Sequence, residues 1–562
     1  MKKIAMLSAL LAAFAGFVCL QTVTPQADLA TYMPAGALLY LQSPDFGRLL
    51  RDWNASQVKT DWLASANYEV FSRSNLFTKL KDVYDQYGAA AGFAPDLQNI
   101  VPIAGTESAL ALYEIRDVEF LYITRVSESA LGESALWALR DKFERREARG
   151  VPFYLRTDAA SGRTVAFAFT KGYLLLGTRD DLVAQSLELI SGGHGPTLAA
   201  EHWSQAVVTQ APIRGDLRLV MHLESLVKSS YFRSYWIQRN ISDVRRFWTG
   251  LADVKLSQAS ITETRVFLRS PDAAESAAPG GPAAIASLLA LAPPEAGMYK
   301  ITPIDDSAET ATLIAGKLIG SVPQRAADQH YAPAAASPDN RAGSEADLET
   351  RIDEQPLPPD AGMSGAIAAV RGMLEKAGAQ SVLWMQSSAA VSGTFFRLPS
   401  VIVVAGAADW DAGAVRSALS DATGSVWTTA HLGAGLASAT AGRHTVERLD
   451  GLGSLMFATR GRVLYLANDA SMLATVLDRS SATSSGTALT YAAGFRHLRE
   501  RPVFDRITAA LDFGAGGTPG PKFFSGNLAS LSHTLSRVAE VRVTAQDKGD
   551  ATTQTVVYEL GR

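Results

Sequence analysis

The stretch Tyr173-Leu174-Leu175-Leu176 decides the fold, because the chain contains a diverged second version of it, Val463-Leu464-Tyr465-Leu466. The offset of 290 residues, from 173 to 463, also places Phe167 on Phe457. Few residues are identical, but the order of features in residues 165–223 is kept: strand, glycine turn, strand, helix, loop and strand. Because the copies are far longer than the roughly 20–50 residues of a solenoid repeat, we expect a tandem duplication rather than an array.

A tight hairpin lies at the centre of each copy. Thr170-Lys171-Gly172 separates two apolar runs in the first copy, and Arg460-Gly461-Arg462 does so in the second. Glycine readily adopts the positive φ that a two-residue hairpin loop needs. We therefore predict an antiparallel strand pair at each position.

Further strand pairs precede these hairpins. Residues 108–115 and 118–126 form one predicted pair, and residues 381–387 and 400–406 form its counterpart. Val401-Ile402-Val403-Val404 is apolar on both faces, which indicates a central strand. Many antiparallel pairs beside separate helices favour the α+β class over a doubly wound parallel sheet. The prediction is two tandem diverged copies of one unit, each a largely antiparallel sheet with helices packed against it.

Composition marks the boundaries of these copies. We predict a signal peptide at residues 1–27, a first α+β repeat at 28–270, a Pro/Gly/Ala/Ser-rich linker at 271–282 and a second repeat at 283–562. Residues 323–360 are rich in Ala, Pro and acidic residues and show little periodicity, so we expect a disordered insertion there.

Apolar spacing also predicts helices. Leu80 and Tyr84 belong to a three-to-four repeat that indicates one buried helix face. Residues 136–143 carry the same spacing, and we expect an amphipathic helix whose charged run, residues 141–146, faces water.

Two aspartates and one further strand complete the pattern of the copies. Asp45 and Asp305 each precede a helix, where a carboxylate can accept the unpaired amide protons of the first turn. Residues 217–223 and 507–513 are the predicted matching strands that follow the central helix of each copy.

The N-terminus has the features of a secretory signal. Lys2 and Lys3 precede the apolar run 4–20, which is short for a membrane span of about 20 residues. We expect export, with cleavage after Ala27; the alternative is an uncleaved anchor. Cys19, the single cysteine, suggests a lipidated N-terminus as a weaker alternative, because Val18 does not fit a lipobox.

Composition narrows the partners. The chain carries a formal charge of −4, whereas a nucleic-acid-binding face should be dominated by basic residues. We expect no nucleic-acid partner, and membrane association only through an uncleaved signal or a lipidated Cys19.

Motifs for catalysis and metal binding are weak. Ser225-Leu226-Val227-Lys228 and Ser56-Gln57-Val58-Lys59 both fit S-x-x-K, but the K-T-G that accompanies this pair is absent. The eight histidines are scattered and form no HExxH. Residues 433–438 match a dinucleotide fingerprint only in part. Asp180-Asp181 starts a predicted helix, where negative charge favours the helix dipole. We predict no catalytic residue, no metal and no cofactor.

One stretch has the composition of a docking surface, because aromatic side chains and arginine are enriched where proteins bind partners. Core packing, or packing between the repeats, is the alternative, since several of its aromatic residues also share helical spacing. The candidate docking residues are Tyr231, Phe232, Arg233, Tyr235, Trp236, Arg239, Phe247 and Trp248.

Two segments resemble a family of uncharacterised, typically exported bacterial envelope proteins, grouped as a domain of unknown function. They are Pro34-Ala35-Gly36-Ala37-Leu38-Leu39-Tyr40 and Gly172-Tyr173-Leu174-Leu175-Leu176-Gly177, the latter leading into Asp181-Leu182. The resemblance covers most of the mature chain and implies an exported protein, but it brings no functional residues with it.

We predict a non-enzymatic protein of the periplasm or cell envelope that binds a partner or supports the envelope. Association with the outer membrane is one form that this location could take. One alternative is a carrier that holds an amphiphile or peptide in the cleft between the repeats, for which a deep apolar pocket would be expected. Another is a hydrolase with a site assembled from distant residues.

Overall fold

The computed structural model describes residues 28–211, 214–229, 244–270, 282–294, 296–320, 361–387, 398–427, 435–451, 453–480, 488–503, 505 and 537–561. The predicted signal peptide, Cys19 and the predicted insertion 323–360 lie outside these ranges. The chain divides into two compact units, Met1–Gln42 with Gln86–Gln205 and Ser43–Asp85 with Ala206–Arg562. The protein is of the α+β class, as predicted.

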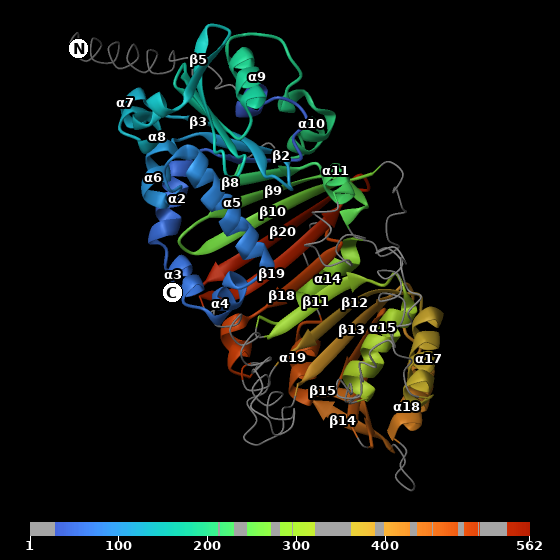
Figure 1. Ribbon diagram of the computed structural model, residues 1–562. Coiled ribbons are helices and arrows are strands. Elements are labelled where there is room, and N and C mark those ends of the chain that lie inside the picture. Colours follow the sequence, from blue (N-terminus) through green and yellow to red (C-terminus); the bar gives the residue numbers. More distant parts are fainter. Residues whose placement is uncertain are drawn as a thin grey trace, which may run out of the picture. The chain divides into compact units, whose positions relative to one another are not determined.

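The first unit is built on an antiparallel sheet with the strand order β1–β2–β3–β7–β6–β5–β4. Figure 1 labels β2, β3 and β5 of this sheet. Its strands are β1 (Leu39–Ser43), β2 (Ser108–Glu114), β3 (Glu119–Arg125), β4 (Glu144–Ala148), β5 (Val151–Thr157), β6 (Thr164–Thr170) and β7 (Tyr173–Gly177). Its helical elements are η1 (Leu29–Tyr32), α6 (Leu97–Ile100), η2 (Val101–Ile103), α7 (Glu128–Gly132), α8 (Ala135–Ala138), η3 (Arg140–Lys142), α9 (Asp180–Ile190) and η4 (Leu198–Ala200).

Aromatic side chains form the centre of this unit's core. Phe167 of β6 is fully buried, and its ring stacks on that of Tyr154 with centroids 5.1 Å apart. The ring of Phe143 meets Phe167 edge to face at the same distance. Helix α9 packs against β6 and β7 and buries Leu182 and Leu187.

The second unit contains a longer antiparallel sheet with the strand order β8–β9–β10–β20–β19–β18–β11–β12–β13–β17–β16–β15–β14. Its first strands are β8 (Leu217–Met221), β9 (Phe247–Leu256), β10 (Ser260–Arg269), β11 (Met298–Pro303), β12 (Ala379–Gln386) and β13 (Ser400–Gly406). The later strands are β14 (Gly435–Ala441), β15 (His444–Asp450), β16 (Ser454–Arg460), β17 (Val463–Ala467), β18 (Tyr491–Phe495), β19 (Val538–Asp547) and β20 (Ala551–Leu560).

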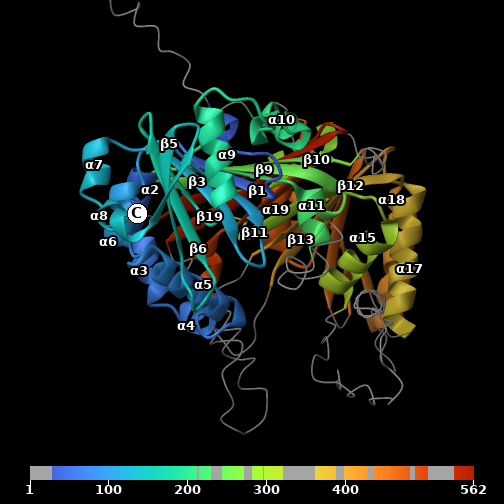
Figure 2. The same ribbon diagram turned by 45° about the horizontal axis from the view of Figure 1, so that its top comes forward.

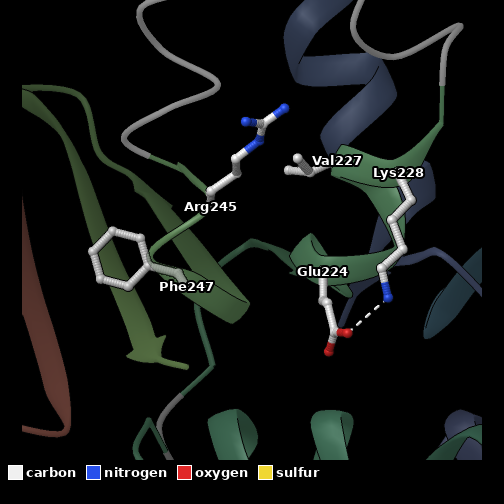
Figure 3. A pocket seen from close by; sticks show the side chains of 5 residues that line it. All are labelled: Glu224, Val227, Lys228, Arg245 and Phe247. Atoms are coloured by element: carbon white, nitrogen blue, oxygen red, sulfur yellow. Dashed lines mark hydrogen bonds and ion pairs between the residues drawn. The ribbon is translucent and has the colours of Figure 1, made fainter. Parts of the chain in front are cut away.

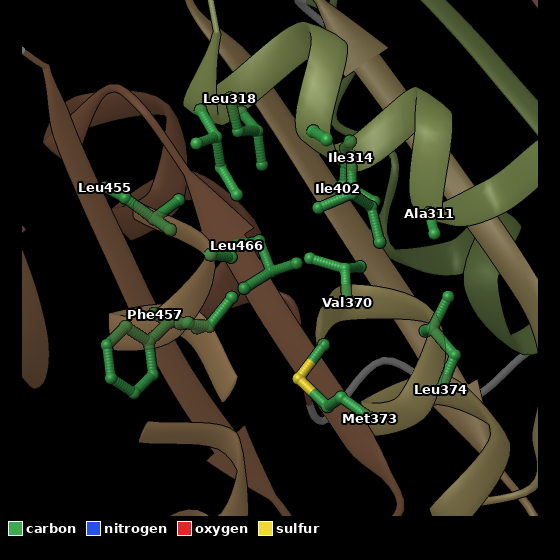
Figure 4. Packing of buried hydrophobic residues seen from close by; sticks show 14 of the residues in the cluster. Ala311, Ile314, Leu318, Val370, Met373, Leu374, Ile402, Leu455, Phe457 and Leu466 are labelled. Atoms are coloured by element: carbon green, nitrogen blue, oxygen red, sulfur yellow. The ribbon is translucent and has the colours of Figure 1, made fainter. Parts of the chain in front are cut away.

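Helices cover both faces of this sheet around β13. Ile402 and Val404 belong to one buried cluster, and Val401 and Val403 belong to the other, so β13 is the central strand that its sequence predicts. The first cluster contains residues from α15 (Ser307–Ile314), the π-helical η6 (Ala315–Ile319), α17 (Ala361–Lys376) and α18 (Ala412–Trp427). Figure 4 shows part of this cluster, with Leu318 of η6 and Val370 of α17 on the side of the sheet that carries Leu466. The second contains residues from α14 (Pro282–Leu291) and α19 (Ala470–Asp478). Figure 2 shows α17 and α18 side by side.

The remaining helices are α2 (Phe46–Ala55), α3 (Gln57–Leu63), α4 (Ala66–Ser72), α5 (Asn75–Ala91), α10 (His202–Val208) and α11 (Leu223–Lys228). The predicted buried face of α5 is partly wrong, because Leu80 is 52% exposed and Tyr84 is 41% exposed. Asp45 caps α2 as predicted, its Oδ1 accepting from the amide of Arg48. The cap of α15 is Asp306 rather than Asp305, with Oδ1 2.7 Å from the amide of Ala308.

The strand order β1–β2–β3–β7–β6–β5–β4 recurs in the second unit as β11–β12–β13–β17–β16–β15–β14. Both predicted hairpins are present: β6–β7 turns through Lys171 and Gly172 at positive φ, and β16–β17 turns through Gly461 at positive φ. Residues 507–513, the predicted match of β8, lie outside the described residues. The strand that precedes β19 is β18, and it pairs with β19 as β8 pairs with β9. The gene duplication itself stays a prediction.

Among the strands that were not predicted from the sequence are β4 and β14. The helix expected over residues 136–146 is wrong beyond η3, because residues 144–148 form β4, which pairs with β5. Residues 435–441, which include the end of the partial fingerprint match at 433–438, form β14, which pairs with β15. Each is the last strand of its sheet among the described residues.

Candidate functional site

Helix α11 presents one apolar and one charged side. Leu223, Leu226 and Val227 are buried, and α11 packs against β9. Glu224 and Lys228 are four residues apart on the exposed side, where Nζ of Lys228 donates to Oε1 of Glu224 at 2.7 Å. This spacing brings opposite charges together on a helix surface.

Strand β9 places Phe247 beside this helix. The register between β9 and β10 shifts between Leu268 and Arg269, so that Phe247 pairs with Arg269 and Trp248 is an additional residue of β9. A bulge of this kind bends a strand and redirects its side chains. The ring of Phe247 lies 5.2 Å from that of Phe267 on β10, which fixes its position.

Gly250 allows the close packing below this point. A Cβ atom at position 250 would lie 2.8 Å from Cδ1 of Phe267 and 3.1 Å from Cδ1 of Leu223. Any larger residue would therefore displace the ring of Phe267 and crowd the side chain of Leu223.

A buried ion pair joins β8 to β9 farther along β9, six residues beyond Phe247. Nε and Nη2 of Arg218 donate to the two carboxylate oxygens of Asp253 at 2.8 and 2.6 Å. Arg218 is 2% exposed and Asp253 is 8% exposed. Nη2 of Arg218 also donates to the carbonyl of Ala211, and the amide of Gly215 donates to Asp253. A charged pair with such additional bonds holds two strands in one register.

Helix α11 and the residues that lead into β9 line an open pocket of about 410 Å³ (Figure 3), within the usual size range of small-molecule sites. Its lining residues are Glu224, Val227, Lys228, Arg245 and Phe247. The hydrogen bond from Lys228 lowers the pKa of Glu224 and so favours the carboxylate form of Glu224. Arg245 is exposed and forms no ion pair with any residue of the described ranges. The pocket therefore combines an unmatched cation with the apolar surface of Val227 and Phe247.

The S-x-x-K pairs have other roles than the predicted motif. Lys228 is bonded to Glu224 as an ammonium, whereas lysine must be neutral and close to serine to activate it. Oγ of Ser225 instead lies 3.4 Å from Nε2 of His222, whose pKa is lowered by burial. Ser56 caps α3 by accepting from the amide of Lys59, which is an ordinary helix start.

The paired carboxylates of α9 are neutralised separately. Asp180 accepts from Nη1 of Arg146 at 2.6 Å, and Asp181 accepts from Nη2 of Arg179 at 2.6 Å. Nη1 of Arg179 also donates to Glu119 at 2.9 Å, and the hydrogen bonds that Arg179 donates to Asp181 and Glu119 raise the pKa of Arg179. The two aspartates thus belong to ion pairs at a helix start rather than to an acid–base pair.

Histidine also serves in structural bonds. Nε2 of His444 lies 2.8 Å from Oδ1 of Asp478, and Nδ1 lies 2.9 Å from Nη2 of Arg460. Because arginine only donates, Nδ1 must accept and Nε2 must carry the proton. Across the described ranges, His, Cys, Asp and Glu side chains nowhere gather in a group of three or more that could hold a metal ion.

The predicted docking residues Tyr231, Phe232, Arg233, Tyr235, Trp236 and Arg239 lie outside the described residues, so this prediction stays a prediction. Phe247 lines the pocket, and Trp248 is half-buried beside it. Glu224 and Val227 were not singled out by the sequence. The one sequence signal for this contact is the i, i+4 spacing of Glu224 and Lys228, which predicts an ion pair on the surface of a helix.

The structure contains no helix, among its described residues, with the length and apolarity needed to cross a membrane. No protein-family model matches the chain, and no curated protein matches it. Two solved structures, crystal forms I and III of TP0453, are similar at 11% sequence identity, with TM-scores of 0.25 and 0.24. Each match covers 44% of this chain and 81% of that chain. A likeness at this level carries no functional argument.

Proposed function

We propose that this protein is a non-enzymatic, exported ligand-binding protein of the periplasm or cell envelope, and that the pocket between α11 and β9 takes an anionic group carried on an apolar chain. The observation that carries the proposal is Arg245, a cation without an ionic partner in the described ranges, beside Val227 and Phe247. An anion gains a charge-assisted hydrogen bond there, and its apolar chain gains contact with the phenyl ring.

The charges around the pocket favour an anion over a cation. Lys228 already neutralises Glu224 at 2.7 Å, so Glu224 offers little attraction to a cationic ligand. Arg246, next to Arg245, adds a second exposed basic side chain at the start of β9. Export rests on the N-terminal sequence of Lys2, Lys3 and the apolar run 4–20.

Binding of decanoate by the purified full-length chain, measured by titration calorimetry, tests the proposal. We expect decanoate to bind more tightly than decanol, which lacks the charge, and than inorganic phosphate, which lacks the chain. Arg245→Gln should weaken decanoate binding by roughly tenfold, the value of one charge-assisted bond. Lys255→Gln is the matched control, because Lys255 is an exposed cation on β9, the strand that follows Arg245, but does not line the pocket.

Two results would contradict this assignment. One is the absence of decanoate binding below the concentration at which decanoate self-associates. The other is an equal loss of affinity in Arg245→Gln and Lys255→Gln, which would indicate a general charge effect rather than a site.

The contact between Ser225 and His222 gives the hydrolase alternative a specific test. The binding proposal predicts that p-nitrophenyl decanoate is hydrolysed no faster by the wild-type chain than by Ser225→Ala. Saturable hydrolysis that Ser225→Ala abolishes would replace the binding proposal by an esterase, with His222 as the base.

A further inference from the structure

The sheet of the second unit ends in β14, the strand farthest from β8 in its order (Figure 1). β14 pairs with β15 from Gly435 opposite Asp450 to Ala441 opposite His444, without a register shift. No other described strand pairs with it. A terminal strand directs backbone N–H and C=O groups away from the sheet, so it can accept another strand.

The side chains of β14 leave this edge accessible. Its sequence, Gly435-Leu436-Ala437-Ser438-Ala439-Thr440-Ala441, contains neither a charge nor a proline. Leu436 is its single large side chain and is 45% exposed. Proteins usually protect an edge with lysine, proline or a bulge, because a bare edge associates. β14 has none of these features.

The corresponding strand of the first unit is protected. β4 pairs with β5 and, among the described strands, with no other. Its sequence, Glu144-Arg145-Arg146-Glu147-Ala148, has four charged and exposed side chains. Charges at an edge must be desolvated when another strand approaches, so β4 resists pairing. The contrast shows that the bare edge is a property of β14 and not of the fold.

Ion pairs of the neighbouring strand β15 and of the β14–β15 turn stabilise the hairpin, and they leave the free edge of β14 uncovered. On the neighbouring strand β15, Glu447 is bonded to Arg416 at 2.6 and 2.8 Å, so its charge is already matched. Beyond the turn, His444 and Arg443 bind Asp478 at the end of α19, at 2.8 and 2.9 Å. The hairpin is therefore ordered before any partner arrives, which lowers the entropy lost on pairing.

We infer that β14 is an assembly edge, at which a second copy of this chain pairs antiparallel with the first to give a weak homodimer. An antiparallel pair centred on Ser438 places Ala437 opposite Ala439 and Leu436 opposite Thr440. Neither copy brings a charge to the seam, so like charges never meet across it. A two-fold interface requires such a self-complementary strand. The inference goes beyond the proposed function and does not depend on the pocket.

Sedimentation equilibrium of the full chain over a dilution series tests the inference. We expect the apparent mass to double at high concentration and to return to that of one chain on dilution. Ser438→Lys should weaken self-association at least roughly tenfold, because it places two like charges together at the seam. Ser417→Lys, at an exposed position of α18, is the matched control and should dimerise like wild type.

Disulfide crosslinking locates the contact. Residues directly opposite in an antiparallel pair have Cα atoms about 4.5–5.5 Å apart, which suits a disulfide. In a Cys19→Ser background, which removes the single native cysteine, Ser438→Cys should give a covalent dimer on oxidation, and Ser417→Cys should not. A wild-type chain that stays monomeric at every concentration overturns the inference, as does equal crosslinking of both cysteine variants.

Discussion

β4 and β14 occupy the same place in the strand order, next to β5 and β15, but they differ in charge. β4 carries four charged side chains in its five residues, whereas β14 carries none in seven. Two sheets with the same strand order can therefore differ at their terminal strands: charged side chains hinder further strand pairing at β4, and no charged side chain hinders it at β14. The difference lies in side chains that contribute little to the core, so it changes association more than stability.

A second comparison lies within the second unit. Arg218 of β8 is opposite Asp253 of β9, and Ala492 of β18 is opposite Thr544 of β19. Each pair takes the same position in its strands, yet only the first is a buried ion pair. The backbone of two strands can pair with either kind of side chain, so the ion pair adds register specificity to β8 and β9 and is not required for the sheet to form.

The largest expected change in the free energy of unfolding comes from removing a core phenylalanine, and it should differ between the core around Phe167 and the core around Phe457. Phe167→Ala removes stacking with Tyr154 and the edge contact with Phe143 in addition to leaving a cavity, so we expect a loss of about 5 kcal/mol. Phe457 lies in a cluster with aliphatic side chains such as Leu455 and Leu466, and Phe457→Ala should cost about 3 kcal/mol. Urea unfolding followed by circular dichroism measures both, and a larger loss for Phe457→Ala would refute the comparison.

The buried pair gives the next largest effect. Asp253→Asn leaves the charge of Arg218 buried without its partner, and we expect the free energy of unfolding to fall by about 3 kcal/mol. The double variant Arg218→Ala, Asp253→Thr copies the Ala492–Thr544 pair and should cost less than Asp253→Asn alone. Additive losses in a double-mutant cycle would show that the two residues act independently.

Neutralising β4 should convert its edge into one like that of β14. In the variant Glu144→Ser, Arg145→Ser, Arg146→Ser, Glu147→Ser, we expect larger oligomers than the wild-type dimer, because a chain with two open edges can extend beyond a pair. Light scattering after gel filtration measures this change. Arg149→Ser, at an exposed position in the turn after β4, is the control and should leave the mass distribution of the wild type.

The smallest expected effect is acid sensitivity of the β19–β20 hairpin. Hydrogen bonding from Arg269 lowers the pKa of Asp547. A carboxyl with a lowered pKa stabilises the fold above its unfolded pKa of about 3.9 and loses that contribution as pH falls through the folded value. Asp547→Asn should therefore lower the Tm at pH 5 but not at pH 2. Leu256→Asn at the end of β9 changes a side chain that is 42% exposed and keeps the backbone hydrogen bond from residue 256 to Asp216, so it should shift the Tm equally at both pH values.

The central elements were predictable from the sequence because they are apolar. The β6–β7 hairpin combines apolar runs with a glycine at positive φ, and β13 is apolar on both faces, so each pattern has one interpretation. The edge strands were not predictable in the same way. Both sides of β4 face solvent, so its charged run matches the water-facing side of a helix equally well. β14 is small and uncharged, which is also typical of a glycine-rich loop.

The candidate site was predictable only in part. The aromatic and arginine-rich composition drew attention to Phe247, which lines the pocket. Lys228 was noticed for the wrong chemistry, because S-x-x-K describes spacing in the sequence and not the partner of the lysine. Its actual partner, Glu224, and the bulge at Trp248 depend on pairing between strands that are distant in sequence.

Hydrogen exchange of the backbone amides, measured by mass spectrometry at two protein concentrations, tests the difference between the edges most directly. The account predicts that peptides covering β14 exchange more slowly at the higher concentration, while peptides covering β4 exchange at the same rate at both. Equal behaviour of β4 and β14, or protection of β4 alone, would contradict it.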